Sequence, residues 1–232
     1  MGYIFLLGFI LGIFIPMIAR RFGKIDLIDP GHILLDLWYK RPALSQKKQK
    51  KRQKSPWYPH FEHLRKLFFI RSFLWGLILG ALGVLSFAYT SFGGWLFPCL
   101  ICLCYLMAID AMHYVLPDFF TLPLLLLGFG AAIFGGLLTP ESAFFGAIYG
   151  YVISVIAVLV MAFKKSSEFG AGDVKLLTAL GAWVGIEGLI YTIILSFIFF
   201  ALGVLRRRTH WGAYGPSLGA SAILILFYFY AK

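Results

Sequence analysis

Eight apolar runs follow one another along this 232-residue chain and leave little room for any other architecture. They cover residues 3–19, 67–89, 93–111, 117–138, 143–163, 174–187, 189–205 and 213–231. A helix of about 20 apolar residues crosses the hydrocarbon core of a bilayer, and most of these runs come close to that length. The sequence therefore predicts an all-α, polytopic membrane helix bundle of about eight transmembrane helices.

The positive charges fit a membrane protein better than a nucleic-acid-binding protein. The formal net charge is +11, yet only 13% of the residues are charged, about half the share that soluble domains carry. Fourteen of the 21 Lys and Arg lie between Arg20 and Arg71, and most of the others flank apolar runs. Such clusters orient membrane helices. We therefore expect the lipid bilayer as a partner and no nucleic acid.

The same charges predict the orientation of the runs. If the eight runs alternate in direction, residues 20–71, Lys164–Lys165 and Arg206–Arg208 all fall on one side of the membrane. The loops on the other side, at 90–94, 139–141 and 186–188, contain no Lys or Arg. Because positive loops mark the cytoplasmic side, the charged side is predicted to face the cytoplasm.

Three segments follow from this pattern. Residues 1–19 predict a first transmembrane helix that is retained, because no positive charge precedes the apolar run. Residues 20–66 predict a basic cytoplasmic loop, with a small interfacial helix at 25–39 and a cationic run at 46–54 that attracts anionic head groups. Residues 67–232 predict the main transmembrane bundle.

The three cysteines, Cys99, Cys102 and Cys104, all lie within one apolar run. The Cys99-x-x-Cys102 spacing is that of metal and redox sites. However, no histidine or second cysteine pair follows at ligand spacing. The cysteines are therefore interpreted as small apolar residues of a membrane helix, and no metal site is predicted.

The predicted orientation places two acidic residues on the same side of the membrane. Asp110 ends a run that crosses towards the cytoplasm, and Asp173 begins a run that leaves it, so both are expected at the cytoplasmic edge of the membrane. Asp118 begins the next run on the same side, whereas Glu141 and Glu187 fall in loops on the other side. An ionisable residue within a membrane segment marks a functional site by default. Asp110 and Asp173 are therefore candidates for a carboxyl pair.

Such a pair has a recognisable chemistry. Two adjacent carboxyl groups do not both ionise readily, so one can take a proton from water while the other polarises a carbonyl. Two alternatives remain open from the residues alone. Aspartate is favoured as a helix cap, which suits Asp173 and Asp118 but not Asp110 at a helix C-terminus. A proton relay through the bundle is the other alternative.

Three stretches resemble signatures of the bacterial prepilin peptidases, the type IV leader peptidases, which are membrane aspartic proteases. Residues 109–123, IDAMHYVLPDFFTLP, resemble their first signature. Residues 170–177, GAGDVKLL, resemble their second signature, the GxGD motif. Residues 213–218, AYGPSL, are similar to the short Gly-Pro motif that opens their last helix. The three stretches occur in the family's order and with the expected topology.

The resemblance implies roles for individual residues. It makes Asp110 and Asp173 the catalytic pair, and it makes residues 67–232 a peptidase bundle. His113 is interpreted as a loop residue beside the site. The residues expected to shape the site are Gly170, Gly172, Lys175, Asp118 and Pro117.

The chain also departs from this family. Many members carry two zinc-binding Cys-x-x-Cys pairs in an N-terminal cytoplasmic region, whereas no cysteine precedes Cys99 here. The loop at 20–66 is therefore interpreted as a shortened region without zinc. It also lacks a glycine-rich strand-turn-helix pattern for S-adenosylmethionine, so N-methylation is not predicted. Met112 stands where a further aspartate is common in the family.

The sequence thus predicts an aspartic endopeptidase at the edge of the bacterial inner membrane, with its active site facing the cytoplasm. It is expected to remove the leader peptide of type IV prepilins or type II secretion pseudopilins without a cofactor. One alternative is a bifunctional leader peptidase and N-methyltransferase, which would use S-adenosylmethionine. A second alternative is a proton-coupled membrane transporter.

Overall fold

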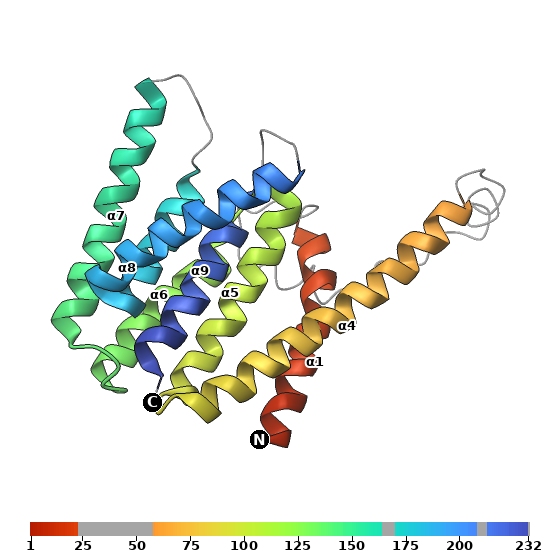
Figure 1. The fold of residues 1–232 in the computed structure, drawn as a ribbon, viewed down its shortest axis with the longest axis horizontal. Helices are drawn as coiled ribbons and strands as arrows, with labels where there is room; N and C mark the ends of the chain where they lie inside the picture. Colours follow the sequence, from red (N-terminus) through yellow and green to blue (C-terminus); the bar gives the residue numbers. More distant parts are fainter. Residues whose placement is uncertain (23–57, 164–169, 208–212, 232) are drawn as a thin grey trace.

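The computed structural model describes residues 1–22, 58–163, 170–207 and 213–231, and these ranges are α-helical without a β-strand. Figure 1 shows the helices side by side in one bundle, with α4 crossing it at a steep angle. This confirms the predicted all-α architecture. The helices are α1 (Gly2–Phe22), α4 (Tyr58–Tyr89), α5 (Gly93–His113), α6 (Asp118–Ile133), α7 (Pro140–Phe163), α8 (Ala171–Arg207) and α9 (Gly215–Tyr230).

Five of the described helices are long and apolar enough to cross a membrane, namely α1, α4, α5, α7 and α8. The other two, α6 and α9, are apolar helices of 16 residues each. At a rise of about 1.5 Å per residue, each of these two extends about 24 Å, slightly less than the hydrocarbon core of a bilayer. The chain is therefore an integral membrane protein, as its hydropathy predicted.

Helix α8 contains both of the runs that the sequence divides at residue 188. Its backbone bends at Gly185, where φ is 65° and ψ is −170°, a conformation that glycine adopts readily. The Tyr230 hydroxyl at the end of α9 donates to the Trp183 carbonyl (2.7 Å) beside this bend. Ser196 on the second arm reaches the other end of α9, at Tyr214. The two arms therefore run in opposite directions, as Figure 1 shows, and together account for two of the eight predicted spans.

Helices α7 and α8 approach each other through glycines. A Cβ on Gly146 would lie 2.2 Å from the Gly181 carbonyl oxygen, and a Cβ on Gly181 would lie 2.1 Å from that of Gly146. A Cβ on Gly150 would lie 2.4 Å from the Leu177 carbonyl oxygen. Small residues at such positions let membrane helices pack backbone against backbone, so they fix the first arm of α8 against α7.

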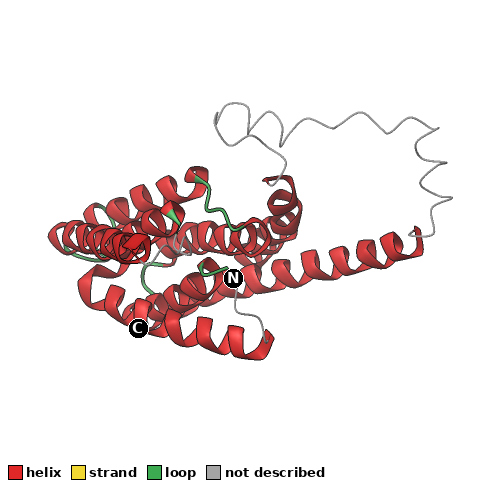
Figure 2. Cartoon of the chain, turned by 90° about the horizontal axis from the view of Figure 1, so that it is seen from above, coloured by secondary structure: helices red, strands yellow, loops and turns green. Residues whose placement is uncertain are grey.

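Helices α1 and α4 cross in the same manner. A Cβ on Gly12 would lie 2.6 Å from the Gly76 Cα, and one on Gly8 would lie 2.9 Å from the Gly80 Cα. Beyond this crossing α4 projects away from the other helices, as Figure 2 shows from above. The start of α4 at Tyr58 lies within the predicted loop at 20–66, whereas its cationic run and predicted interfacial helix lie outside the described residues.

Helix α5 is the central element because it contributes to two buried clusters. In the first cluster it packs with α6, α8 and α9 around Trp183, whose indole N–H donates to the Leu124 carbonyl (2.8 Å). In the second cluster, Cys104 and Ile109 of α5 pack with Ile15 of α1 and with α4. The last turn of α5, which holds Asp110, is thus supported from both sides.

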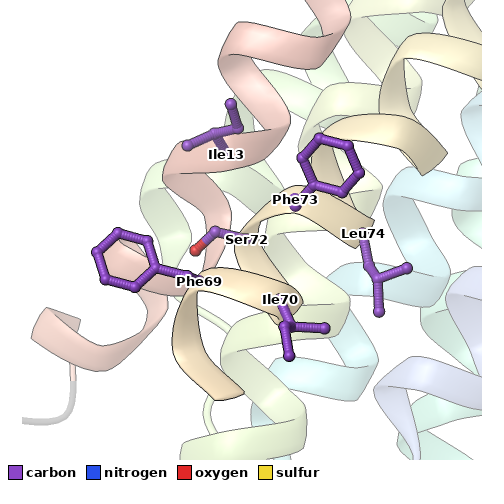
Figure 3. A pocket seen from close by; sticks show the side chains of 6 residues that line it. All are labelled: Ile13, Phe69, Ile70, Ser72, Phe73 and Leu74. Carbon is purple, nitrogen blue, oxygen red and sulfur yellow. The ribbon is translucent and has the colours of Figure 1, made fainter. Parts of the chain in front are cut away.

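An open, apolar cavity of about 450 Å³ lies at the surface where α1 and α4 meet, as Figure 3 shows. The buried Ser72 hydroxyl has no hydrogen-bond partner in the described part of the chain. None of the lining residues is acidic, so this cavity is separate from the candidate carboxyl pair. The lining residues are Ile13, Phe69, Ile70, Ser72, Phe73 and Leu74.

Replacing Gly146 by valine is expected to lower the free energy of unfolding by about 1–3 kcal/mol, the usual cost of overpacking. The reason is that its side chain would collide with the backbone of α8. Thermal unfolding of the purified protein in detergent measures the change. Gly203→Ala is the control, because a Cβ there would meet nothing within 4 Å. Equal unfolding midpoints for the two variants would contradict the described contact between α7 and α8.

Candidate active site

Asp110 lies in the last turn of α5, and its side chain is buried, with 5% of the residue exposed. Its Oδ2 accepts a hydrogen bond from the backbone N–H of Gly215 (2.9 Å), the first residue of α9. A Cβ on Gly215 would lie only 2.6 Å from this oxygen. Glycine is therefore needed at this position for α9 to approach the carboxyl group so closely.

Asp173 lies in the first turn of α8 and is also buried, with 9% of the residue exposed. Its Oδ2 accepts from the Gly170 N–H (3.1 Å), while its own N–H donates to the Gly170 carbonyl (3.1 Å). The side-chain bond is one half of a capping box, in which an acid at the third position of a helix holds the N–H of the residue before the helix; Gly170 has no side chain to supply the other half. The capping interpretation of Asp173 is therefore correct, and it leaves the rest of the carboxyl group available.

The two carboxyl groups lie close enough for the charge of Asp173 to act on Asp110. In each group Oδ2 is held by a backbone N–H, whereas Oδ1 has no hydrogen-bond partner among the described residues. The ends of α5 and α8 therefore bring two acids within range of each other's charge, and in each acid a backbone N–H holds one oxygen. The predicted topology likewise places Asp110 and Asp173 at the same end of the bundle.

The segment between α5 and α6 sets the approach of α8. Tyr114 ends α5 in the left-handed conformation (φ 56°), and its N–H donates to the Asp110 carbonyl (2.9 Å). The chain then places Leu116 so close to α8 that a Cβ on Gly172 would lie 2.9 Å from the Leu116 Cβ. Gly170 is not crowded, since its Cβ would have no neighbour nearer than 3.8 Å. Gly172 thus permits close packing, whereas Gly170 contributes its N–H.

The remaining predicted residues lie beside the pair. The Pro117 carbonyl accepts from the first turn of α6. The Lys175 ammonium contacts both oxygens of Asp118 (2.6 and 2.8 Å), and both side chains are about half exposed. Lys175 therefore links α8 to α6, and within the described residues it forms no hydrogen bond with Asp110 or Asp173.

His113 forms a tie between helices. Its Nε2 lies 2.8 Å from the Ala19 carbonyl oxygen and must carry a proton there, because a carbonyl only accepts. The Tyr105 hydroxyl makes a parallel tie from α5 to the Leu11 carbonyl (2.9 Å). The ring of His113 therefore holds α1 against the end of α5.

Sequence reasoning missed two residues at this site, Tyr214 and Ser196. Their hydroxyl groups hydrogen-bond each other, and the charge of Asp173 acts on Tyr214. Tyr214 lies in the AYGPSL stretch, and the resemblance of that stretch to a Gly-Pro motif is a signal that points to this position. Ser196 stands alone in an apolar run and gave no signal.

The described helices contain no group of three His, Cys, Asp or Glu residues that could hold a metal ion. Cys99 and Cys104 are buried in the packing of α5, and Cys102 is partly buried. The candidate site therefore consists of the two carboxyl groups with the backbone and hydroxyl groups around them.

Fold and site together define a class of protein. It is an integral membrane helix bundle with a pair of buried carboxyl groups where two helix ends meet, the arrangement required for acid–base chemistry on water. Comparison with known families gives a more specific assignment. Residues 97–205 match the model of the Type IV leader peptidase family, and this range includes Asp110 and Asp173. The part of the chain that holds both acids is therefore similar to the type IV leader peptidases, and the resemblance seen in the motifs is confirmed.

Individual relatives agree with this assignment. The chain is similar to the prepilin leader peptidase/N-methyltransferase of Pseudomonas aeruginosa, with 45% identity over 43% of this chain and 35% of the relative. The protein of the same name from Neisseria gonorrhoeae is 37% identical over 50% of this chain and 42% of the relative. That from Xanthomonas campestris pv. campestris is 32% identical over 66% and 57%. The chain thus spans about a third to just over half of these relatives, and no solved structure matches it.

Removing the exposed ion pair between Asp118 of α6 and Lys175 of α8 is expected to change the free energy of unfolding only slightly. Lys175→Ala and Asp118→Ala should each lower the free energy of unfolding by no more than about 1 kcal/mol, because solvent screens such pairs. A double-mutant cycle followed by chemical denaturation in detergent measures their coupling. A coupling several times larger would contradict the exposed position that the structure gives the pair.

Proposed function

We propose that the protein is an aspartic endopeptidase that removes the leader peptide from type IV prepilins or type II secretion pseudopilins. The observation that carries this proposal is the pairing of Asp110 with Asp173 inside the range that matches the leader peptidase family. The printed names of the relatives, which describe prepilin leader peptidases, support the same reaction. The precursor proteins would be its partners.

The proposed reaction site suits a precursor that has a short basic leader followed by an apolar helix. The leader of such a precursor would remain in the cytoplasm while its helix lies in the bilayer, so the bond to be cleaved lies at the boundary. The positive loops support a bacterial inner-membrane location in which both acids face the cytoplasm. Asp110 and Asp173 would then meet the precursor at that boundary.

In the proposed mechanism the two acids divide the proton transfers. One carboxylate removes a proton from water, and the resulting hydroxide attacks the scissile carbonyl carbon to form a tetrahedral intermediate. The other carboxyl group donates its proton to the amide nitrogen, and the C–N bond breaks to release the new amine. Because both acids are buried, the low local dielectric strengthens these interactions.

The backbone donors orient this pair before substrate arrives. Each N–H holds the Oδ2 of one carboxyl group and so fixes the orientation of that group. Groups fixed in advance need little reorganisation during the reaction. The donors from Gly170 and Gly215 therefore support a catalytic role for both acids, in addition to a role in helix capping.

The position of the acids favours a peptidase over the transporter alternative. A proton relay across the bilayer needs ionisable groups at several depths. Among the described residues the buried Asp and Glu side chains are Asp110 and Asp173, which lie together at one end of the bundle. This arrangement is suited to one reaction site.

A second candidate function adds N-methylation of the cleaved product. It is favoured by the printed names of the relatives, which include N-methyltransferase. S-adenosylmethionine would supply the methyl group. It stays the second candidate because the sequence at 20–66 has no glycine-rich pattern typical of a site for this cofactor. Transfer of a labelled methyl group to a processed pilin would establish the second activity, and its absence would exclude it.

Asp110→Asn and Asp173→Asn are each expected to lower kcat for leader cleavage by about 10²- to 10⁴-fold, the contribution typical of a general acid or base. Cleavage of a precursor pilin by the purified protein in detergent measures the loss. Glu187→Gln is the matched control, because Glu187 is exposed beside the Gly185 bend, and it should cleave normally. Unimpaired cleavage by either asparagine variant would refute the aspartic mechanism.

A further inference from the structure

The first residues of α9 are held by the second arm of α8. The Ser196 hydroxyl donates to the Ile193 carbonyl (2.7 Å). A serine hydroxyl has a single proton to give, so in its hydrogen bond with Tyr214 the tyrosine must be the donor. The phenol of Tyr214 is thereby tied, through Ser196, to the backbone of α8.

The ring of Tyr214 is enclosed by the same arm. Its centroid lies 5.8 Å from that of Phe197 and 5.7 Å from that of Phe200, the latter in an edge-on arrangement. Both spacings are within the range in which aromatic pairs attract. A hydrogen bond and two ring contacts from α8 therefore hold Tyr214 in place.

Tyr214 immediately precedes Gly215, whose N–H holds Asp110. The Tyr214 carbonyl also accepts from the N–H groups of Ser217 and Leu218 (3.0 Å each), which starts the helix. One turn further on, a Cβ on Gly219 would lie 2.4 Å from the Met107 Cγ on α5. Helix α9 thus lies tightly against α5, with its first turn fixed at Tyr214.

We propose that Tyr214 is a positioning residue for the leader peptidase reaction: tied to Ser196, it keeps the Gly215 N–H directed at Asp110. This inference rests on the proposed peptidase function. In this arrangement the positions of both acids depend on the same helix, α8. Asp173 belongs to the first arm of α8, while Asp110 is held by the second arm through Ser196, Tyr214 and Gly215. The bend at Gly185 joins the two arms and so relates one acid to the other.

Two substitutions remove the tie while leaving the rings in place. Tyr214→Phe deletes the phenol hydroxyl, and Ser196→Ala deletes its acceptor. Each is expected to lower kcat for leader cleavage about tenfold, the effect of one lost hydrogen bond on a barrier. KM should stay unchanged, because neither residue is proposed to bind the precursor. The double variant should be no slower than either single variant, since both remove the same interaction.

Ser221→Ala is the matched control. Ser221 is a buried serine of α9 whose hydroxyl donates to the Leu218 carbonyl of its own helix (2.8 Å). It should retain the wild-type kcat. Normal kcat in Tyr214→Phe, or strictly additive losses in the double variant, would overturn the positioning role.

A measurement without substrate separates this inference from the proposed function. Hydrogen–deuterium exchange of the Gly215 amide reports its hydrogen bond to Asp110 directly. Exchange should be about tenfold faster in Tyr214→Phe and Ser196→Ala, the effect expected when a bond of this strength is weakened, and unchanged in Ser221→Ala. Unchanged exchange in all three would overturn the inference even if the enzyme cleaves pilins. Faster exchange in a protein that cleaves no pilin would uphold the Tyr214 tie and refute the peptidase function.

Discussion

The hydrogen bond from the Gly215 N–H to Asp110 is the interaction on which the rest of the site depends. A buried carboxyl group needs a hydrogen-bond donor. Asp110 lies at the C-terminal end of α5, where the unpaired backbone groups are carbonyls, which only accept, and where the helix dipole disfavours a negative charge. The donor comes instead from the N-terminus of α9, and Asp173 receives the equivalent donor from Gly170 at the start of α8. Helix N-termini thus orient both acids.

This interaction requires glycines of α8 and α9 to lie directly against side chains of neighbouring segments. Gly215 lies against the Asp110 carboxylate, Gly219 against Met107, and Gly172 against Leu116. A methyl group at any of these positions would lie less than 3 Å from its neighbour, so either the backbones or the facing side chains would have to shift. The glycines between α7 and α8 apply the same principle to the scaffold. The positions of the two acids at the end of the bundle therefore depend on close contacts at glycines, both beside the acids and between α7 and α8.

Much of this arrangement could be predicted from the sequence. Hydropathy and loop charges predicted the helices, and their alternation brought Asp110 and Asp173 to the same end. Hydropathy and loop charge can be read directly from the sequence, and the alternating direction of the helices follows from them. The bend at Gly185 could not be distinguished from a loop between two helices, because both interrupt an apolar run. The pairing of Lys175 with Asp118 and of Tyr214 with Ser196 depends on how separate helices are rotated against each other, which no local pattern records.

The most direct test of the account is whether residues 110 and 173 meet in the membrane. Asp110→Cys and Asp173→Cys would be combined in a protein whose Cys99, Cys102 and Cys104 are replaced by alanine, and treated in native membranes with a short thiol-specific crosslinker. The account predicts an intramolecular crosslink for this pair, and none when Asp110→Cys is combined with Glu187→Cys beside the Gly185 bend. Absence of the first crosslink, although both thiols react with a monofunctional reagent, would contradict the carboxyl pair itself.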